Sequence, residues 1–202
     1  MLAVCAVATF IGWSVARSQL NDREFDRFQL RVRQVTNEVQ ARIHDYQLAL
    51  VAARSFLAAH PQAGRSAWRT YVEGLDLPVS FPGIDGLGFI AHVRAEELPA
   101  FLALTRAEGI ADFQLRPEGQ RADYFPIKWI EPLERNQAAV GFDIGSEAQR
   151  RAAAEQARDS GQATLTARIV LVQYPAARSA VLFLLPVYRP GAPLGSVEER
   201  RP

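Results

Sequence analysis

The sequence predicts an α+β fold in which one very long helix precedes a domain of antiparallel strands and shorter helices. Two observations lead to this fold class. Residues 15–60 contain neither glycine nor proline, which is typical of an uninterrupted helix. The segments that follow read as helix and strand in the order β-α-β-β-β-α-β-β. Their connections are short, and consecutive strands joined by short loops pair antiparallel.

Residues 1–20 are predicted to form a transmembrane anchor. No charge occurs before Arg17, and residues up to Leu20 complete a short span of the ~20 residues that a bilayer requires. A cleaved signal peptide is the alternative, because Ser14-Val15-Ala16 resembles a cleavage site. Such a peptide starts with positive charge, which is missing here. The anchor is therefore favoured, and its cytoplasmic flank could have been trimmed away.

The long helix is predicted to continue to His60, so that residues 21–60 form a stalk. The segment from Val15 to His60 would measure roughly 65 to 70 Å at ~1.5 Å per residue. A 3.5-residue apolar repeat, with Arg42 in its one missing place, comprises Phe28, Val32, Val35, Val39, Tyr46, Ala49, Ala53 and Phe56. Such a repeat favours packing against another helix, commonly that of a dimer partner. A helix that covers its own domain's sheet is an equally open interpretation.

Three further helices are expected along the chain. Pro61 ends the long helix, and residues 65–78 give a shorter one that closes near Gly74. Residues 94–109 give the next, with Gly109 as its C-cap. The last begins at Ser146, which forms a capping box with Gln149, and ends at Gly161. The final residues, 196–202, read as the start of another helix or a loop, so a fragment of a longer protein is expected.

Strands are expected wherever β-branched and aromatic residues run together between turns. Pro126 restricts the third of the predicted extended segments to a sheet edge or a bulge. These segments are Leu87–Val93, Asp112–Arg116, Tyr124–Glu131, Ala139–Ile144, residues 164–173 and residues 180–188.

Composition excludes several classes of protein. The 202 residues are 49% hydrophobic, which is ample material for a core. Lys and Arg number 23 and Asp and Glu 22, spread along the chain, so nucleic acid is not expected as a partner. Cys5 is the one cysteine, which excludes an internal disulfide.

No catalytic or metal-binding constellation is evident in the sequence. His44, His60 and His92 lie far apart, and none has a second ligand at helical or turn spacing. There is no G-x-S-x-G motif, and the one thiol lies in the apolar N-terminal segment. Adjacent acids at 96–97 are typical of a solvated helix surface. We therefore expect no enzymatic activity from this chain, no cofactor and no metal.

One carboxylate requires an explanation, because Asp143 follows the apolar stretch at residues 138–142. A buried carboxylate must find hydrogen-bond donors. Local capping is one interpretation, with the Asp143 side chain accepting from the backbone amide of Gly145 or Ser146. Alternatively, the carboxylate faces a cavity and binds donor groups of a ligand. Spacing alone leaves both interpretations open.

Residues 124–173, "YFPIKWIEPLERNQAAVGFDIGSEAQRRAAAEQARDSGQATLTARIVLVQ", followed by "FLLPVYRPGAPLGSVEER" at residues 183–200, resemble the CHASE domain. The resemblance extends over about residues 25 to 200. Its motifs include Y-F-P-I, I-E-P, G-F-D, L-T and P-V-Y. CHASE domains are extracytoplasmic sensor domains of receptor histidine kinases, nucleotide cyclases and diguanylate cyclases, the plant cytokinin receptors among them.

The resemblance implies a stalk helix followed by two PAS-like modules between two transmembrane helices. Residues 61–190 would then form the membrane-distal, ligand-sensing PAS-like module. Residues 191–202 would begin the membrane-proximal region, which this chain does not complete.

The resemblance also implies a ligand site. In cytokinin receptors the aspartate of the corresponding motif binds the ligand's ring nitrogens, and a backbone group at L-T assists. Carried over by motif, these are Asp143 and Leu165, with Thr166 and Tyr124 as neighbours. The family usually has proline after L-T-A, whereas this chain has Arg168. That cation would pair with Asp143 or favour an anionic ligand over a neutral purine.

The leading hypothesis is a homodimeric sensor domain, anchored in the cell (inner) membrane and facing the periplasm, that binds an unidentified small molecule. A histidine kinase or cyclase beyond the C-terminal end would supply the output. The cavity walls would be apolar, although a role as ordinary core is favoured for the same residues: Phe125, Phe142, Phe183 and Leu185. A structural dimerisation module that binds nothing is the alternative, and a secreted hydrolase is a third.

Overall fold

A computed structural model describes residues 2–173 and 179–201, with side chains described for Trp13 and from residue 25 onward within those ranges. Helices combine with small antiparallel sheets, so the predicted α+β class is confirmed. The chain divides into two compact units, Met1–Asp45 and Tyr46–Pro202. Each unit is considered by itself below.

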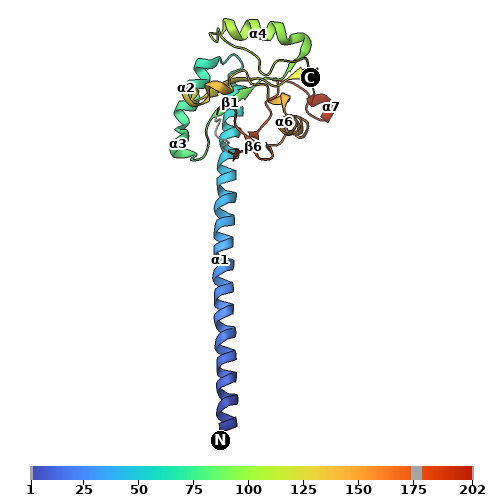
Figure 1. Ribbon diagram of the computed structural model, residues 1–202. Coiled ribbons are helices and arrows are strands. Elements are labelled where there is room, and N and C mark those ends of the chain that lie inside the picture. The colour runs from blue at the N-terminus through green and yellow to red at the C-terminus, as the bar shows by residue number, and fades with distance from the viewer. Residues whose placement is uncertain (1, 174–178, 202) are drawn as a thin grey trace. The chain divides into compact units, whose positions relative to one another are not determined.

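The first unit consists of most of helix α1 (Leu2–Ala59), which is drawn in blue in Figure 1. The predicted uninterrupted helix over residues 15–60 is therefore confirmed. Phe28, Val32, Val35 and Val39 are exposed, with between 42% and 61% of each residue accessible to solvent. They form an apolar row on the helix surface at coiled-coil spacing. Pairing of this row with a second helix stays a prediction.

The predicted anchor over residues 1–20 falls, apart from Trp13, outside the part of the chain whose side chains are described. Among the residues that are described, no helix combines the length and the apolar character that crossing a membrane requires.

In the second unit, the last turns of α1 pack against their own domain. Ala49 and Ala53 are buried, and Phe56 packs against the first hydrophobic core. The apolar repeat of the sequence therefore has two different roles along its length. From Ala49 onward the helix covers its own domain, as the second interpretation of the repeat expected.

The remaining helices are short. They are α2 (Arg65–Leu75), α3 (Leu77–Ser80), α4 (Leu98–Ala107), α5 (Leu133–Asn136), α6 (Ala148–Ser160) and α7 (Val197–Arg200), with the 3-10 turns η1 (Ala95–Glu97), η2 (Gln137–Ala139) and η3 (Ile144–Ser146). Gly161 caps α6 in the left-handed conformation, as predicted. The predicted Ser146–Gln149 capping box is wrong. Glu147 is the N-cap residue, and the Ser146 hydroxyl instead donates to the carbonyl of Asp143.

All described strand pairs are antiparallel, as predicted. They are β1 (Leu87–Ile90) with β4 (Ile127–Glu131), β2 (Val93–Arg94) with β3 (Asp123–Tyr124), β5 (Thr164–Leu165) with β8 (Phe183–Leu184), and β6 (Ile169–Val170) with β7 (Ser179–Ala180). However, β1 pairs with β4 and β5 with β8, and not each with the next strand in the chain. The register between β1 and β4 shifts after Phe89. Pro126, which lacks an amide donor, separates β3 from β4, so the irregularity expected there is confirmed.

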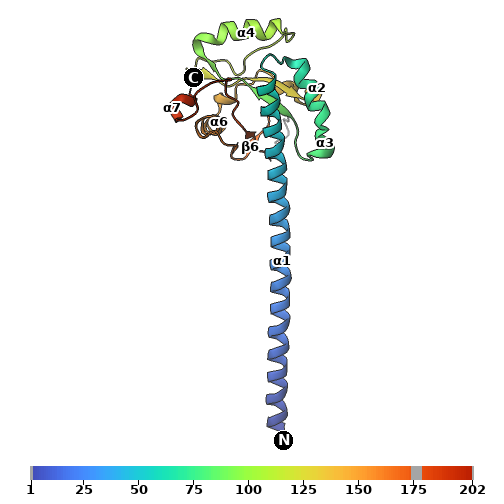
Figure 2. The same ribbon diagram turned by 180° about the vertical axis from the view of Figure 1, so that it is seen from behind.

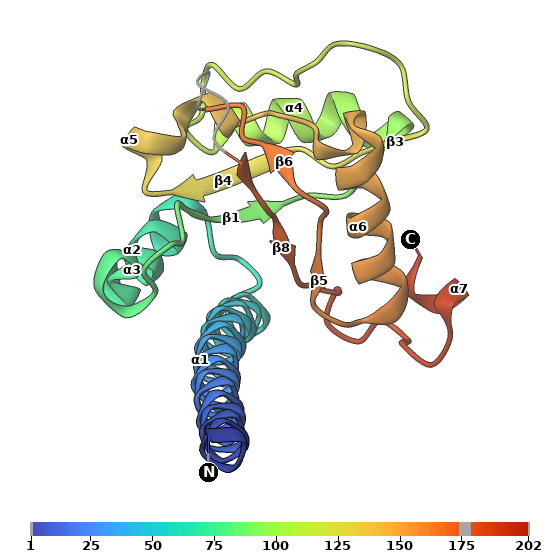
Figure 3. The same ribbon diagram turned by 60° about the horizontal axis from the view of Figure 1, so that its bottom comes forward.

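Helices surround the β1–β4 pair. α2 and α3 lie at one end of the pair and α6 lies near the other (Figure 3). The last turns of α1 and helix α4 lie on opposite sides of it, as the two opposed views show (Figures 1 and 2).

Two of the predicted strands are not formed. Ala139–Ile144 folds into the turns η2 and η3, linked by Gly141 at φ +79°. Asp112–Arg116 contributes only an isolated bridge from Arg116 to Phe142. The turn brings the Gly141 backbone so close to Gln114 that a Cβ atom would lie 2.0 Å from the Gln114 carbonyl oxygen. A regular strand cannot take this path because it does not use the left-handed conformation.

Two hydrophobic cores share β1 and β4. The first contains Leu87 and Trp129 together with Trp68 and Val72 of α2 and the end of α1. The second core comprises Phe125, Ile127, Ala139 and Ile144, with Ile90, Ile130, Phe142, Ala154, Leu182 and Leu184 packed against it. Each side of the strand pair therefore belongs to a different group of elements.

The turn at Gly141 predicts a large cost for a small substitution. Gly141→Ala combines a left-handed backbone, worth about 1–2 kcal/mol, with a clash against the Gln114 carbonyl, so a loss of at least ~2 kcal/mol in the free energy of unfolding is expected. Gly109→Ala is the matched control. Its φ is +96°, but nothing lies within 4 Å of the added Cβ. Denaturant titration of both variants measures the difference, and equal losses would contradict the steric argument.

Candidate functional site

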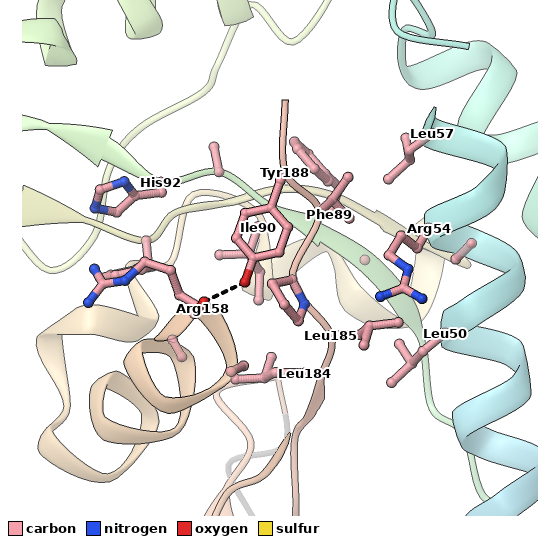
Figure 4. A pocket seen from close by; sticks show the side chains of 18 of the residues that line it. Leu50, Arg54, Leu57, Phe89, Ile90, His92, Arg158, Leu184, Leu185 and Tyr188 are labelled. Atoms are coloured by element: carbon pink, nitrogen blue, oxygen red, sulfur yellow. Dashed lines mark hydrogen bonds between the residues drawn. The ribbon is translucent and has the colours of Figure 1, made fainter. Parts of the chain in front are cut away.

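A cavity of ≈ 490 Å³ lies in the second unit, between the two hydrophobic cores. Its wall is formed by the last turns of α1, by β1, by α6 and by the segment that follows β8 (Figure 4). The volume falls within the range of small-molecule sites, which is about 300–1,000 Å³. The cavity is therefore large enough for a ligand of several rings.

The wall is mainly apolar, with charged groups at intervals. The apolar side chains labelled in Figure 4 are Leu50, Leu57, Phe89, Ile90, Leu184 and Leu185. The charged or titratable side chains on the wall are Arg54, His92, Arg158, Tyr188, Arg189, Glu199, Arg200 and Arg201. Five guanidinium groups thus share the wall with one carboxylate, which gives it a positive electrostatic character.

Three of the four residues predicted to form apolar walls do line this cavity. Phe125, Phe183 and Leu185 are part of its surface. Phe142 is not; its ring lies under the guanidinium of Arg150, with 4.9 Å between Cζ and the ring centroid. Contact with a ligand stays a prediction for all four.

Asp143 is completely buried, and its carboxylate is held by the chain itself. Oδ1 accepts the backbone amide of Phe125 at 2.7 Å and that of Gly145 at 2.9 Å. Oδ2 accepts no hydrogen bond, and Nη1 of Arg121 lies 3.4 Å from it without hydrogen-bond geometry. The Gly145 contact makes Asp143 the N-cap of η3, so the local interpretation of this carboxylate is confirmed.

Asp143 is absent from the cavity surface, whereas its neighbours Phe125 and Ile144 belong to it. The carboxylate thus lies immediately behind the wall and fixes the backbone that forms it. Ligand binding by Asp143 stays a prediction; its Oδ2 is buried and accepts no hydrogen bond among the described residues.

The other predicted site residues do not gather around one cavity. Leu165 is 44% exposed on β5, and Arg168 is exposed without any contact to Asp143.

Thr166 is buried, and its hydroxyl accepts the amide of Leu182 at 2.9 Å. Tyr124 is buried, and its hydroxyl donates to the Gly119 carbonyl and accepts the amide of Arg121. The cation beside Asp143 is Arg121, in place of the predicted Arg168.

A charged network that the sequence did not predict lies next to this region. His92 Nε2 is 2.9 Å from Asp123 Oδ2, and Arg151 Nη1 is 2.6 Å from Asp123 Oδ1. Burial opposes ionisation of Asp123, but the hydrogen bonds from Arg151 and His92 outweigh it and hold the pKa of Asp123 below its usual value. Arg151 also donates to the Gly145 carbonyl, so the network is attached to the turn that Asp143 caps.

Sequence spacing could not reveal this network because its members come from distant segments. His92 and Asp123 are 31 positions apart, and Asp123 and Arg151 are 28 apart. The sequence does mark Arg54 as unusual, because it is the one charged residue in the mainly apolar stretch 48–59. Among the residues whose structure is described, no group of three or more His, Cys, Asp or Glu side chains could hold a metal ion.

A partly open, mainly apolar cavity beside a small sheet has the general form of a small-molecule binding site. The model of the family described as "CHASE domain" matches residues 61–202, more than half of the chain. The chain therefore belongs to the CHASE domain family, as the motifs predicted. CHASE domains are sensor domains of signalling receptors, including histidine kinases. The match begins after α1, whereas the resemblance was expected from about residue 25.

One relative supports the same assignment. Hybrid signal transduction histidine kinase A of Dictyostelium discoideum is 28% identical over 140 residues, which cover 66% of this chain. The aligned region covers 6% of that kinase, so the chain spans only a small part of its relative's length.

The contacts of Asp143 predict a large structural cost of removing it. Asp143→Ala leaves two buried amides without an acceptor and Arg121 without its carboxylate, so a loss of about 2–5 kcal/mol in the free energy of unfolding is expected. Asp112→Ala, which removes an exposed carboxylate, is the control and should change it by less than ~0.5 kcal/mol. Denaturant titration measures both, and similar values would mean that the two Oδ1 contacts contribute little.

The lowered pKa of Asp123 predicts an acid-dependent loss of stability. The unfolded carboxyl titrates near ~3.9, above the folded value, so Asp123 stabilises the fold above that pH and loses this contribution as pH falls through its folded pKa. The wild type should therefore exceed Asp123→Asn in stability near neutral pH, and the difference should shrink below about pH 4. Urea titrations between pH 2.5 and 7 test this, with Glu118→Gln as an exposed control. A difference that does not vary with pH would refute it.

Proposed function

We propose that this chain is the extracytoplasmic ligand-sensing domain of a transmembrane receptor, and that the cavity between its two cores binds a small molecule. Family membership supports the sensor role, and the cavity of ≈ 490 Å³ is the single observation that carries ligand binding. The pocket is partly open to solvent and mainly apolar, which is the usual character of a small-molecule site.

The cavity wall joins elements that are distant in sequence. Residues of α1, β1, α6 and the segment after β8 all contribute to it. A ligand that contacts them together would stabilise the arrangement in which they surround it. It would shift the conformational equilibrium only by the difference in its affinity for the two arrangements.

The role of Asp143 follows from its place behind the wall. Its Oδ1 holds the amides of Phe125 and Gly145, next to the wall residues Phe125 and Ile144. Direct recognition of a ligand, implied by the family resemblance, would require a donor group to approach Oδ2. Leu165, Thr166, Tyr124 and Arg168 would be secondary to the cavity residues in this proposal.

The wider receptor is also part of the proposal. Residues 1–20 would anchor the chain in the inner membrane, α1 would form a homodimeric stalk, and the domain would face the periplasm with a PAS-like arrangement. The output would come from a kinase or cyclase elsewhere in the protein, and this chain itself would have no enzymatic activity. The relative named a histidine kinase supports a kinase output.

A structural dimerisation module is the second candidate function. The observation that favours it is the exposed row of Phe28, Val32, Val35 and Val39, at the spacing of a helix–helix seam. Dimerisation is compatible with both functions, whereas occupation of the cavity belongs only to the sensor. The two are therefore distinguished by a test of the cavity.

Filling the cavity should abolish binding without removing the fold. Leu184→Trp places an indole in the cavity, whereas Val79→Trp adds the same group at a site that is 76% exposed. A metabolite screen by thermal shift should yield ligands that stabilise the wild type and Val79→Trp alike, with affinity for Leu184→Trp at least about tenfold weaker. Isothermal titration measures these affinities. If no metabolite stabilises the wild type, or if Leu184→Trp binds equally well, this cavity is not the sensing site.

A further inference from the structure

We propose that the cavity selects an amphipathic anion, a small molecule with an apolar body and one carboxylate or sulfonate group, and that Arg54 binds the anionic group. This inference rests on the proposed function, because it requires that the cavity take a ligand. It adds the chemical class of that ligand and the residue that determines specificity.

Arg54 is half-buried on the face of α1 that forms the cavity wall, between Leu50 and Leu57. Its guanidinium points away from the helix toward Leu185 (Figure 4). Within the described part of the chain, it has neither a hydrogen bond nor an ion pair. A partly desolvated cation without a counter-charge is unfavourable, and an anion placed beside it would relieve that cost.

The other cations of the wall differ from Arg54 because they are engaged or exposed. Arg158 and Arg201 form ion pairs with Asp159 at 2.8 and 2.5 Å. Arg200 donates to the backbone carbonyls of Leu194 and Asp159. Arg189 is exposed to solvent. Arg54 is therefore the wall arginine that is both sheltered and without a partner among the described residues.

The remaining titratable groups of the wall leave the anion without a competitor. His92 is paired with Asp123, and Glu199 Oε2 accepts the amides of Gly195 and Ser196 at 2.7 and 3.1 Å. The Tyr188 hydroxyl donates to the carbonyl of Arg158, so its ring alone remains as a wall surface. No carboxylate of the wall is thus paired with Arg54.

The apolar part of the wall defines the rest of the ligand. Phe89, Ile90 and Leu184 face the cavity together with Leu185 and the Tyr188 ring (Figure 4). Such a surface favours an aromatic or aliphatic body, while a guanidinium binds a carboxylate or sulfonate through two parallel hydrogen bonds. A neutral ligand would leave the Arg54 charge uncompensated.

Two fluorescent dyes of nearly the same shape provide the test. 8-Anilinonaphthalene-1-sulfonate carries a sulfonate, and N-phenyl-1-naphthylamine is its uncharged counterpart. Their dissociation constants are measured by fluorescence titration on the 202-residue chain, on Arg54→Met and on Arg33→Met. Arg33 is an exposed arginine of the first unit and serves as the matched control for the loss of one positive charge. Leu184→Trp reports whether the dyes occupy the cavity, and thermal melting confirms that each variant is folded.

The proposal predicts that the sulfonate dye binds the wild type about tenfold more tightly than the neutral dye, as expected for one charge-assisted contact. Arg54→Met should remove this preference and leave the neutral dye unaffected, while Arg33→Met changes neither. Equal affinities that Arg54→Met does not alter would overturn the anion proposal and leave the cavity as a binding site. Failure of both dyes to bind, or binding that Leu184→Trp does not weaken, would overturn the proposed function as well.

Discussion

The carboxylate of Asp143 connects segments on which both the second core and the cavity wall depend. Its Oδ1 accepts amides from Phe125, which follows β3, and from Gly145, which lies in the turn that leads into α6. Burial of a carboxylate is tolerated only when such donors compensate for lost hydration. These contacts place Phe125 and Ile144 at the wall, and Arg151 of α6 is bonded to the same turn through the Gly145 carbonyl. The position of α6 is therefore tied to that of one buried acid.

The cavity and its charges follow from this arrangement. β1 contributes residues to both cores, and residues of both cores line the cavity. Two half-buried carboxylates near the cavity are paired within the chain, Asp123 with His92 and Arg151, and Asp159 with Arg158 and Arg201. Arg54 is different because its charge has no partner in the described chain. A sheltered charge without a counter-charge is suited to recognise a ligand of complementary charge.

Local patterns predicted the elements that depend on local chemistry. The long helix, its end before Pro61 and the Gly161 cap all follow from residues a few positions apart. The turn at 139–144 was predicted as a strand because its residues are apolar. The close approach of the Gln114 backbone to Gly141, 27 positions away, cannot be read from that pattern.

The same limit applies to the site. The sequence identified Asp143 as unusual, but the bond to Phe125 and the Asp123 network arise from pairings that spacing cannot show. Arg54 was overlooked because it fits a solvated position of a long helix.

Under the proposed function, the ligand would act through the wall elements that it brings together. Arg54 and Leu57 belong to the same continuous helix as the exposed row at Phe28 and Val39. A ligand contact on this helix changes the energy of any arrangement in which the helix takes a different position. The coupling is limited by the ligand's differential affinity, so a single charge-assisted contact worth about 1.4 kcal/mol would shift such an equilibrium about tenfold. An anion that neutralises Arg54 in only one arrangement would supply that difference, whereas apolar contacts alone would be shared by both.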